Sequence, residues 1–286
     1  MKTSEIFNLG IQLGMKKEEK NDIDAANPYP DSQVLYAKKN REIKKIAAGI
    51  DMGIEEIFLA KKMFDCDLVI SHHPYAQSIG QLPDILLQQT GNLEVYGIST
   101  KEIGDLIKRS SEKLKRQVME DNFFREIQIC QKLDIDFINL HTPLDNLAVF
   151  ILKKMIADKK LKTQGDFIDA VLNLSEFKMA DRYGQKAFIA NGKKEDLLGK
   201  VSFSEFLGGQ ESDAGIFQIM KRCKIDTVIV PHLSENFFQA AVRAGLKVIY
   251  CGHMASDSLG FNFFIDEVLR TEKQIEVISL GGLLRL

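Results

Sequence analysis

The sequence predicts an α/β protein with layered, mixed sheets flanked by helices. Two parts of the chain support this class, because each places a strand-like apolar run, an amphipathic helix and a second apolar run in succession. These parts lie at about 43–70 and at 227–250. A β-α-β unit of this kind pairs its strands in parallel through a right-handed crossover. With 286 residues, the chain is long enough to bury one large core or two modest ones.

The first half of the chain alternates helices and strands. Apolar residues at helical spacing mark the helices, and short apolar runs bounded by turn-forming residues mark the strands. Pro28 and Pro30 place a loop after the first helix. The elements expected in order are a helix over 3–19, a strand over 43–51, a helix over 54–64, a strand over 68–70, a mainly helical stretch over 81–132, a strand over 136–140 and a helix over about 146–159.

The stretch from about 160 to 224 differs in character. It combines two short helical pieces with strand-like runs over 186–190 and 200–206, and Gly208-Gly209 precedes a helix. Backbone amides at such a helix start are able to hold an anion. An ordinary turn is favoured here, because the acidic Glu211 and Asp213 would repel an anion.

The chain then returns to the strand-and-helix pattern over 227–250. A helix over about 258–271 and a strand over 274–280 end the chain. We therefore expect one α/β lobe that carries the functional site and is formed by residues 1–159 and 225–286, with a smaller middle lobe formed by residues 160–224.

Composition argues against several classes of protein. The chain is 45% hydrophobic and 27% charged, and its formal net charge is -2, so it lacks the basic excess of a typical nucleic-acid-binding protein. Lysine-rich runs near 38–41 and 153–162 are interpreted as solvated helix faces. No apolar run approaches the roughly 20 residues of a membrane span, and the N-terminus lacks a signal peptide's apolar stretch. The expected location is cytoplasmic, with no membrane partner.

The cysteines point to the same compartment. They lie far apart and form no Cys-x-x-Cys pair, which predicts reduced thiols in the cytosol. Neither a disulfide framework nor a zinc ribbon is indicated. The four residues are Cys66, Cys130, Cys223 and Cys251.

All five histidines of the chain follow an apolar, strand-like run. In layered α/β proteins the carboxyl ends of strands are where ligands are usually bound. His72 and His73 end the run at 68–70 and point in different directions, and Pro74 stops the strand. Taken alone, the pair is explained more simply by histidines that bind no ligand. The other histidines are His141, His232 and His253.

Two further motifs each join a histidine to a carboxylate four residues later. In His141-Thr-Pro-Leu-Asp145 the turn lets both end residues face the same cavity, although Asp145 also suits a helix cap. In Gly252-His-Met-Ala-Ser-Asp257 a helical turn would bring His253 and Asp257 onto one face. The alternative is that Asp257 or its neighbour Ser256 caps a helix.

The combination predicts a metal centre. Nitrogen and oxygen ligands without thiolate suit zinc, manganese, iron, cobalt or nickel. Five or six such ligands exceed the needs of one tetrahedral ion. We therefore expect two divalent transition-metal ions per subunit, about 3.5–4 Å apart and bridged by a carboxylate, as in other dinuclear hydrolases.

In this order and at these separations, the motifs resemble the family of GTP cyclohydrolase 1 type 2 homologues, also named after the Ngg-one-interacting factor three. The likeness is carried by Ser71-His-His-Pro74 and the two motifs above, and it extends to Ile50-Asp51 and Gly208-Gly209. It implies a two-lobed subunit of a toroidal homohexamer, with metal pairs lining the inner cavity. It also implies five metal ligands, which are His72, His73, Asp145, His253 and Asp257.

The chain departs from the family pattern in three places. Asp257 stands where the family usually has glutamate, which is one methylene longer. Val230-Pro-His-Leu-Ser-Glu235 replaces a Thr-Gly-Glu/Asp segment, so His232 inherits no ligand role and is expected either to line the cavity or to be structural. The charged helical stretch over 101–132 exceeds the compact family pattern and indicates a variant branch.

The leading functional hypothesis is a metal-dependent hydrolase that acts on an undetermined small molecule through a metal-bridged hydroxide. His141 is the catalytic candidate for proton transfer, because it lies beside the ligands without a ligand assignment and its unperturbed pKa is about 6.5. The alternative is a metal-binding scaffold or regulator whose lysine-rich helices bind a protein or a nucleic acid. A purely structural metal is less expected, since such sites are usually closed and rich in cysteine ligands.

Overall fold

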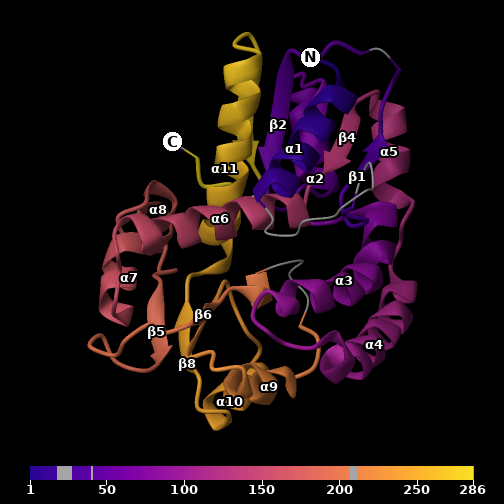
Figure 1. The fold of residues 1–286 in the computed structure, drawn as a ribbon. Coiled ribbons are helices and arrows are strands. Elements are labelled where there is room, and N and C mark those ends of the chain that lie inside the picture. Colours follow the sequence, from indigo (N-terminus) through magenta and orange to yellow (C-terminus); the bar gives the residue numbers. More distant parts are fainter. Residues whose placement is uncertain (18–27, 40, 207–210, 286) are drawn as a thin grey trace.

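The computed structural model describes residues 1–17, 28–39, 41–206 and 211–285. Across these residues the chain forms two mixed sheets flanked by helices (Figure 1), which confirms the α/β class predicted from the sequence. The glycine pair Gly208-Gly209 lies outside the described residues. Within the described part, no helix is both long enough and apolar enough to cross a membrane.

The first sheet has the strand order β1-β4-β3-β2-β9. β2 pairs in parallel with β3 and β9, and β3 pairs in parallel with β4, whereas β1 is antiparallel to β4. The sequence did not predict β1, because only Leu35 among its four residues is buried and no alternating pattern results. The strands are β1 (Gln33–Tyr36), β2 (Lys45–Gly49), β3 (Leu68–Ser71), β4 (Asp136–Asn139) and β9 (Glu276–Leu280).

The second sheet has the strand order β5-β8-β7-β6. β8 pairs in parallel with β7 and antiparallel with β5, and β6 is parallel to β7. The expected lobe boundary at 224/225 thus falls between two paired strands, β6 and β7; the division into lobes stays a prediction. The strands are β5 (Phe188–Asn191), β6 (Val201–Ser202), β7 (Thr227–Val230) and β8 (Lys247–Tyr250).

Helices flank both sheets, and α3 and α4 form a pair beside them in Figure 1. The α-helices are α1 (Thr3–Lys17), α2 (Ile54–Lys62), α3 (Leu82–Glu94), α4 (Thr100–Gln117), α5 (Arg125–Leu133), α6 (Thr142–Asp158), α7 (Gln164–Val171), α8 (Ser175–Arg182), α9 (Ile216–Arg222), α10 (Glu235–Arg243) and α11 (His253–Thr271). Short 3-10 turns are η1 (Ala76–Gln81), η2 (Val118–Glu120) and η3 (Ser204–Phe206).

Two helices begin earlier than the sequence predicted, and both differences matter for the site. α6 starts at Thr142 because Pro143 fits the first helical turn, so Asp145 lies inside that turn instead of capping the helix. α11 starts at His253, so Asp257 lies one turn inside the helix and is no cap. The run over 200–206 is also shorter as a strand than expected, since β6 gives way to η3.

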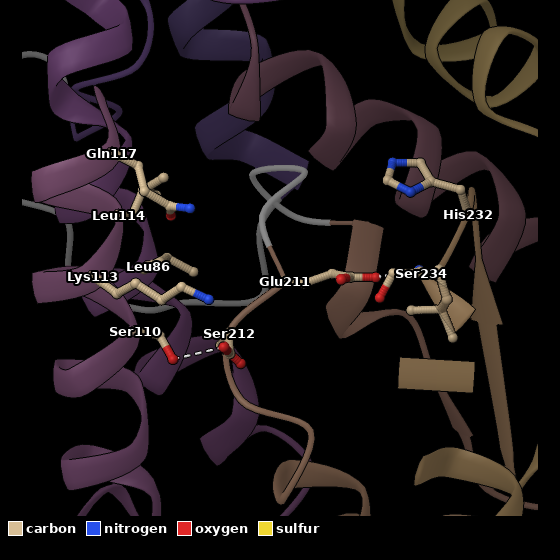
Figure 2. A pocket seen from close by; sticks show the side chains of 10 residues that line it. Leu86, Ser110, Lys113, Leu114, Gln117, Glu211, Ser212, His232 and Ser234 are labelled. Carbon is tan, nitrogen blue, oxygen red and sulfur yellow. Dashed lines mark hydrogen bonds between the residues drawn. The ribbon is translucent and has the colours of Figure 1, made fainter. Parts of the chain in front are cut away.

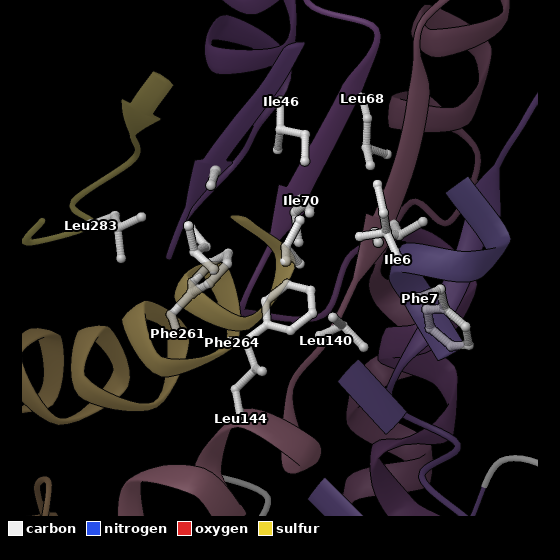
Figure 3. Close-up of a cluster of buried hydrophobic side chains, with 14 of the residues drawn as sticks. Ile6, Phe7, Ile46, Leu68, Ile70, Leu140, Leu144, Phe261, Phe264 and Leu283 are labelled. Carbon is white, nitrogen blue, oxygen red and sulfur yellow. The ribbon is translucent and has the colours of Figure 1, made fainter. Parts of the chain in front are cut away.

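The crossing of α6 and α11 connects the two sheets (Figure 1). Phe261 and Phe264 of α11 point toward Ile70 and Leu140 in the core of the first sheet (Figure 3). Earlier residues of α11 and later residues of α6 instead pack in a second cluster against the other sheet. At the crossing itself, a Cβ atom on Gly260 would overlap the backbone oxygen of Leu144. The glycine therefore allows the close approach that places the start of α6 beside α11.

Candidate metal centre

Three strand ends and two helix starts bring the predicted site residues together. His72 and His73 follow β3, and their backbone N–H groups donate to the carbonyls of Gly49 and Ile50 at 2.9 and 3.0 Å. His141 follows the neighbouring strand β4 and opens α6, which carries Asp145. His253 and Asp257 come from the first two turns of α11, which follows β8. The α6–α11 crossing thus joins ligands that are distant in the sequence.

The backbone at Gly252 aims α11 at this site. Its φ of +93° lies in a region that side chains other than glycine rarely adopt. The glycine ends the connection from β8 and lets the helix begin at the next residue. His253 and Asp257 then lie one helical turn apart, and their Nε2 and Oδ2 atoms are 3.1 Å apart.

An inner group of side chains, His72, His141 and Asp145, is buried. Ligand atoms of the three lie within 4.8 Å of one another. The Nε2 of His72 is 3.3 Å from Oδ1 of Asp145. The exposed fraction of each side chain is 6% or less.

An outer pair, His73 and His253, is more open. Their Nε2 atoms are 3.2 Å apart, and their side chains are 22% and 37% exposed. Asp257 lies between the two sets, because its Oδ2 is 3.6 Å from Nε2 of His72 and 3.4 Å from Nε2 of His73. The structure therefore brings together all five predicted ligands, with His141 beside them.

Three of these histidines are held by the ring nitrogen that faces away from the centre. Nδ1 of His72 donates to the carbonyl of Leu140 at 3.1 Å, and Nδ1 of His73 donates to Asp51 at 2.7 Å. Nδ1 of His141 donates to Asp31 at 2.8 Å. Because these oxygens only accept, each Nδ1 carries a proton, and Nε2 is the atom that would bind a metal once the ring is neutral. Metal-bound histidines usually have such a partner.

Two buried atoms at the centre have no hydrogen-bond partner among the described residues, namely Nε2 of His72 and Oδ2 of Asp257. Leaving polar atoms of this kind unsatisfied costs free energy, and a buried carboxylate is especially costly. Two ligand atoms bound about 2.1 Å from one tetrahedral ion lie about 3.4 Å apart, which is close to the separations in this cluster. Cations between these atoms would satisfy both, so the residues fit a metal site.

The electrostatics agree with a cation site. Burial opposes ionisation of Asp257, but the adjacent histidines, first among them His72, hold the pKa of its carboxyl well below the usual range. Burial lowers the pKa of His73, yet its contacts with Asp257 and Asp51 outweigh this and raise it to about 10. Without metal, Asp257 and Asp51 therefore keep the His73 ring protonated. A metal ion has to displace that proton.

Asp31 is the supporting residue that the sequence did not reveal. It is fully buried, and besides His141 it accepts the hydroxyl hydrogen of Thr142 at 2.7 Å. The unpredicted strand β1 brings it there, since Gln33 pairs with Asn139 at the end of β4. A carboxylate just after the Pro28–Pro30 loop was the only local signal. Asp51, whose pKa is lowered by the hydrogen bond from His73, belonged to the wider motif, but its role was not anticipated.

His232 lies next to the centre. Among the described residues it belongs to neither group that could hold an ion, which are His72, His73 and Asp257, and His72, His141 and Asp145. Its ring centroid is 4.6 Å from that of His253. Burial, and then the neighbouring His253, lower its pKa. The residue lines a cavity of about 430 Å³ beside α4, which Figure 2 shows. Whether it also lines the cavity that carries the metal centres stays a prediction.

Comparison with solved structures identifies the fold. A NIF3 superfamily protein from Sphaerobacter thermophilus aligns with a TM-score of 0.78 and 22% identity over 99% of both chains. This chain has the NIF3 fold. Reduced HcgD from Methanocaldococcus jannaschii aligns with a TM-score of 0.58 at 18% identity, and the protein ybgI, of unknown function, with 0.54 at 15%, each over 98% of both chains. No protein-family model and no curated protein matches the sequence.

The NIF3 fold confirms, at the level of architecture, the resemblance inferred from the three motifs. The alignments span nearly the whole chain, including the helical stretch that was expected to exceed the family pattern. His/Asp groups able to hold metal lie at the strand ends of this fold. Fold and site together fit a metal-binding protein.

Proposed function

We propose that this chain is a NIF3-family protein that binds two divalent transition-metal ions per subunit. The inner ion would be held by His72, His141 and Asp145, and the outer ion by His73 and His253. Asp257 would contact both, because its Oδ2 faces the nitrogens of His72, His73 and His253 at 3.1–3.6 Å. Zinc, manganese, iron, cobalt and nickel all suit this set of nitrogen and oxygen donors.

One observation carries the proposal. Nε2 of His72 and Oδ2 of Asp257 are buried, lie 3.6 Å apart and make no hydrogen bond of standard geometry in the described chain; Oδ2 has only ion-pair contacts with the rings of His73 and His253. A folded protein rarely leaves two such groups unsatisfied side by side. The charge of Asp257 and the lone pair of His72 are both complementary to a cation.

The position of His141 favours a ligand role over the proton-transfer role expected from the sequence. Its Nδ1 is bound to the buried Asp31, and it lies within ligand distance of His72 and Asp145. We therefore propose it as the sixth ligand. Proton transfer by His141 stays a prediction, which a pH–rate profile of an active preparation would test.

We propose further that the chain is a metal-dependent hydrolase of a small molecule. Two bound metal ions supply Lewis acidity and lower the pKa of a bound water toward neutrality. The protein's part is to orient the imidazoles through Asp31, Asp51 and the Leu140 carbonyl, and to bury the inner group away from bulk solvent. The more exposed outer pair is the side from which a substrate would approach.

The test separates metal binding from hydrolysis. Elemental analysis of protein reconstituted with zinc or manganese should find about two equivalents per subunit in the wild type and fewer in Asp145→Ala. Both proteins are then screened against phosphoesters, nucleotides and cyclic amides. Hydrolysis by the wild type alone supports the enzyme. If the wild type binds two equivalents of metal but neither protein hydrolyses any of these compounds, the hydrolase proposal is rejected and the metal centre is retained.

The alternative function is a metal-binding scaffold or regulator. The observation that favours it is α4, where Lys108, Arg109, Lys115 and Arg116 are accessible. Contact with nucleic-acid phosphates would make binding fall steeply with added salt. Measuring DNA affinity at two salt concentrations tests this alternative, and absent or salt-independent binding counts against it.

We also propose that the subunits form a toroidal homohexamer in the cytoplasm. The assembly is supported by the family resemblance and by apolar side chains exposed on and after α2, namely Phe58, Met63 and Phe64. The location is supported by the free thiols of all four cysteines. Native mass spectrometry should find six subunits, and a monomer at micromolar concentration would contradict the assembly.

A further inference from the structure

A second feature of the structure adjoins the metal centre, and we name it the α4 cavity. It has a volume of about 430 Å³ and lies between the side chains of α4 and the loop that follows β7 (Figure 2). This volume is in the range of pockets that take small organic ligands. At one end the cavity is lined by His232, whose ring packs beside that of His253 in the outer pair. A molecule in the cavity would thus lie next to the exposed side of the metal centre.

The lining combines an apolar surface with opposed polar groups. Leu86, Leu114 and Leu233 supply the apolar part. Lys113 and Gln117 extend from α4 toward Glu211 on the opposite wall (Figure 2). Within the described residues Lys113 forms no ion pair, so its ammonium group is available to an anion.

Hydrogen bonds hold the walls in place. The hydroxyl of Ser110 on α4 donates to the carbonyl of Ser212 at 2.6 Å. The backbone N–H of Ser234 donates to Oε1 of Glu211 at 2.5 Å. The segment that carries Glu211 is thereby tied to α4 on one side and to the β7–α10 loop on the other, which fixes the distance across the cavity before any ligand arrives.

We propose that the α4 cavity is the specificity pocket for the substrate of the metal centre, an inference that rests on the proposed function. It would bind a small organic anion whose phosphate or carboxylate contacts Lys113 and whose apolar body packs against the leucines. An N–H or O–H group at the other end of the ligand would donate to Glu211, which keeps the anionic group away from this carboxylate. The reacting group would extend past His232 toward the outer pair. Lys113 and Glu211 would then select the substrate, while the metal ligands would carry out the reaction.

The experiment measures binding without turnover. Phenylphosphonate, which carries an anionic group on an apolar ring and resists hydrolysis, is titrated calorimetrically into wild-type protein freed of metal with a chelator. Lys113→Met should weaken its binding about tenfold, the effect expected for loss of a charge-assisted contact. Lys113→Arg, which keeps the charge, should restore most of the affinity. Lys115→Met removes a nearby lysine of the same helix that does not line the cavity, and should bind like the wild type.

Two outcomes would reject the proposed specificity pocket. In the first, the wild type binds no phenylphosphonate. In the second, the wild type and Lys113→Met bind it with equal affinity. Because the titration uses metal-free protein, its result can be interpreted even if the hydrolase proposal fails. Conversely, metal-dependent turnover that is indifferent to Lys113→Met would leave the hydrolase intact and reject the pocket.

Discussion

The two halves of the metal centre differ in how they are built. The inner group of His72, His141 and Asp145 follows two adjacent strands of the first sheet and is almost fully buried. The outer pair of His73 and His253 joins that sheet to α11 and is partly open to solvent. The supporting carboxylates differ in the same way, since Asp31 is fully buried and Asp51 is 59% exposed. The inner half is therefore suited to hold an ion firmly, and the outer half to exchange ligands.

Removing a ligand should produce the largest effect and separate the halves. Asp145→Ala should retain only the outer ion, and His253→Ala only the inner one. Asp257→Ala should lose most of both, because its carboxylate faces the two sets. Elemental analysis after identical reconstitution should therefore find about one equivalent in Asp145→Ala and in His253→Ala, and close to none in Asp257→Ala. Equal metal content in the three variants would show that the assigned ligands do not define two sites.

Gly260→Ala should disturb both halves through the helix crossing. The added methyl group meets backbone atoms of Leu144 and Ala148, which no rotamer change relieves. We expect the free energy of unfolding to fall by about 1–3 kcal/mol, together with weaker metal binding.

Gly104→Ala provides the matched control for that substitution. It is also a helical glycine, but a Cβ there meets no atom within 4 Å. We expect a gain of about 0.5–1 kcal/mol, because alanine favours the helix. Chemical denaturation compares the two, and similar effects from both would mean that the close crossing is not needed.

The supporting carboxylates should have smaller and unequal effects. Asp31→Asn weakens the partner of His141 and should reduce affinity for the inner ion by about 10–100-fold. Asp51→Asn should reduce affinity for the outer ion by less, since water already reaches this exposed side chain. Competition with a chromogenic chelator gives both affinities. If Asp51→Asn loses more metal affinity than Asp31→Asn, the outer ion is the more firmly held of the two, and the assignment of the two halves is wrong.

Asp257→Glu should have the smallest effect. It keeps the carboxylate and adds one methylene at a position that is 6% exposed. We expect two ions to remain bound, with a change in affinity below about tenfold. Loss of one ion in this variant would show that the shorter side chain is required by the spacing of α11 in this chain.

The sequence predicted the parts of the site that depend on local pattern. Apolar runs ending in histidine located His72, His73, His141 and His253, and the four-residue spacing placed Asp257 beside His253. The helix starts at Thr142 and His253 were predicted too late: Pro143 was assigned to a turn ahead of the helix, and the helix after Gly252 was expected only from about residue 258. Proline fits a first helical turn, and this glycine is the residue just before the helix.

Other parts depend on contacts that no local pattern records. Asp31 reaches His141 only through the pairing of β1 with β4, across 110 residues of sequence. The α4 cavity likewise needs α4 and the segment at Glu211 to be side by side. Such pairings are set by the packing of the whole fold, which is why neither Asp31 nor Lys113 stood out in the sequence.

The most direct test of a two-ion centre is anomalous scattering from crystals of the zinc-reconstituted protein, recorded on both sides of the zinc absorption edge. A two-ion centre predicts two peaks per subunit. One lies among His72, His141 and Asp145, the other lies between His73 and His253, and Asp257 contacts both. A single peak, or no peak within reach of these side chains, would contradict it.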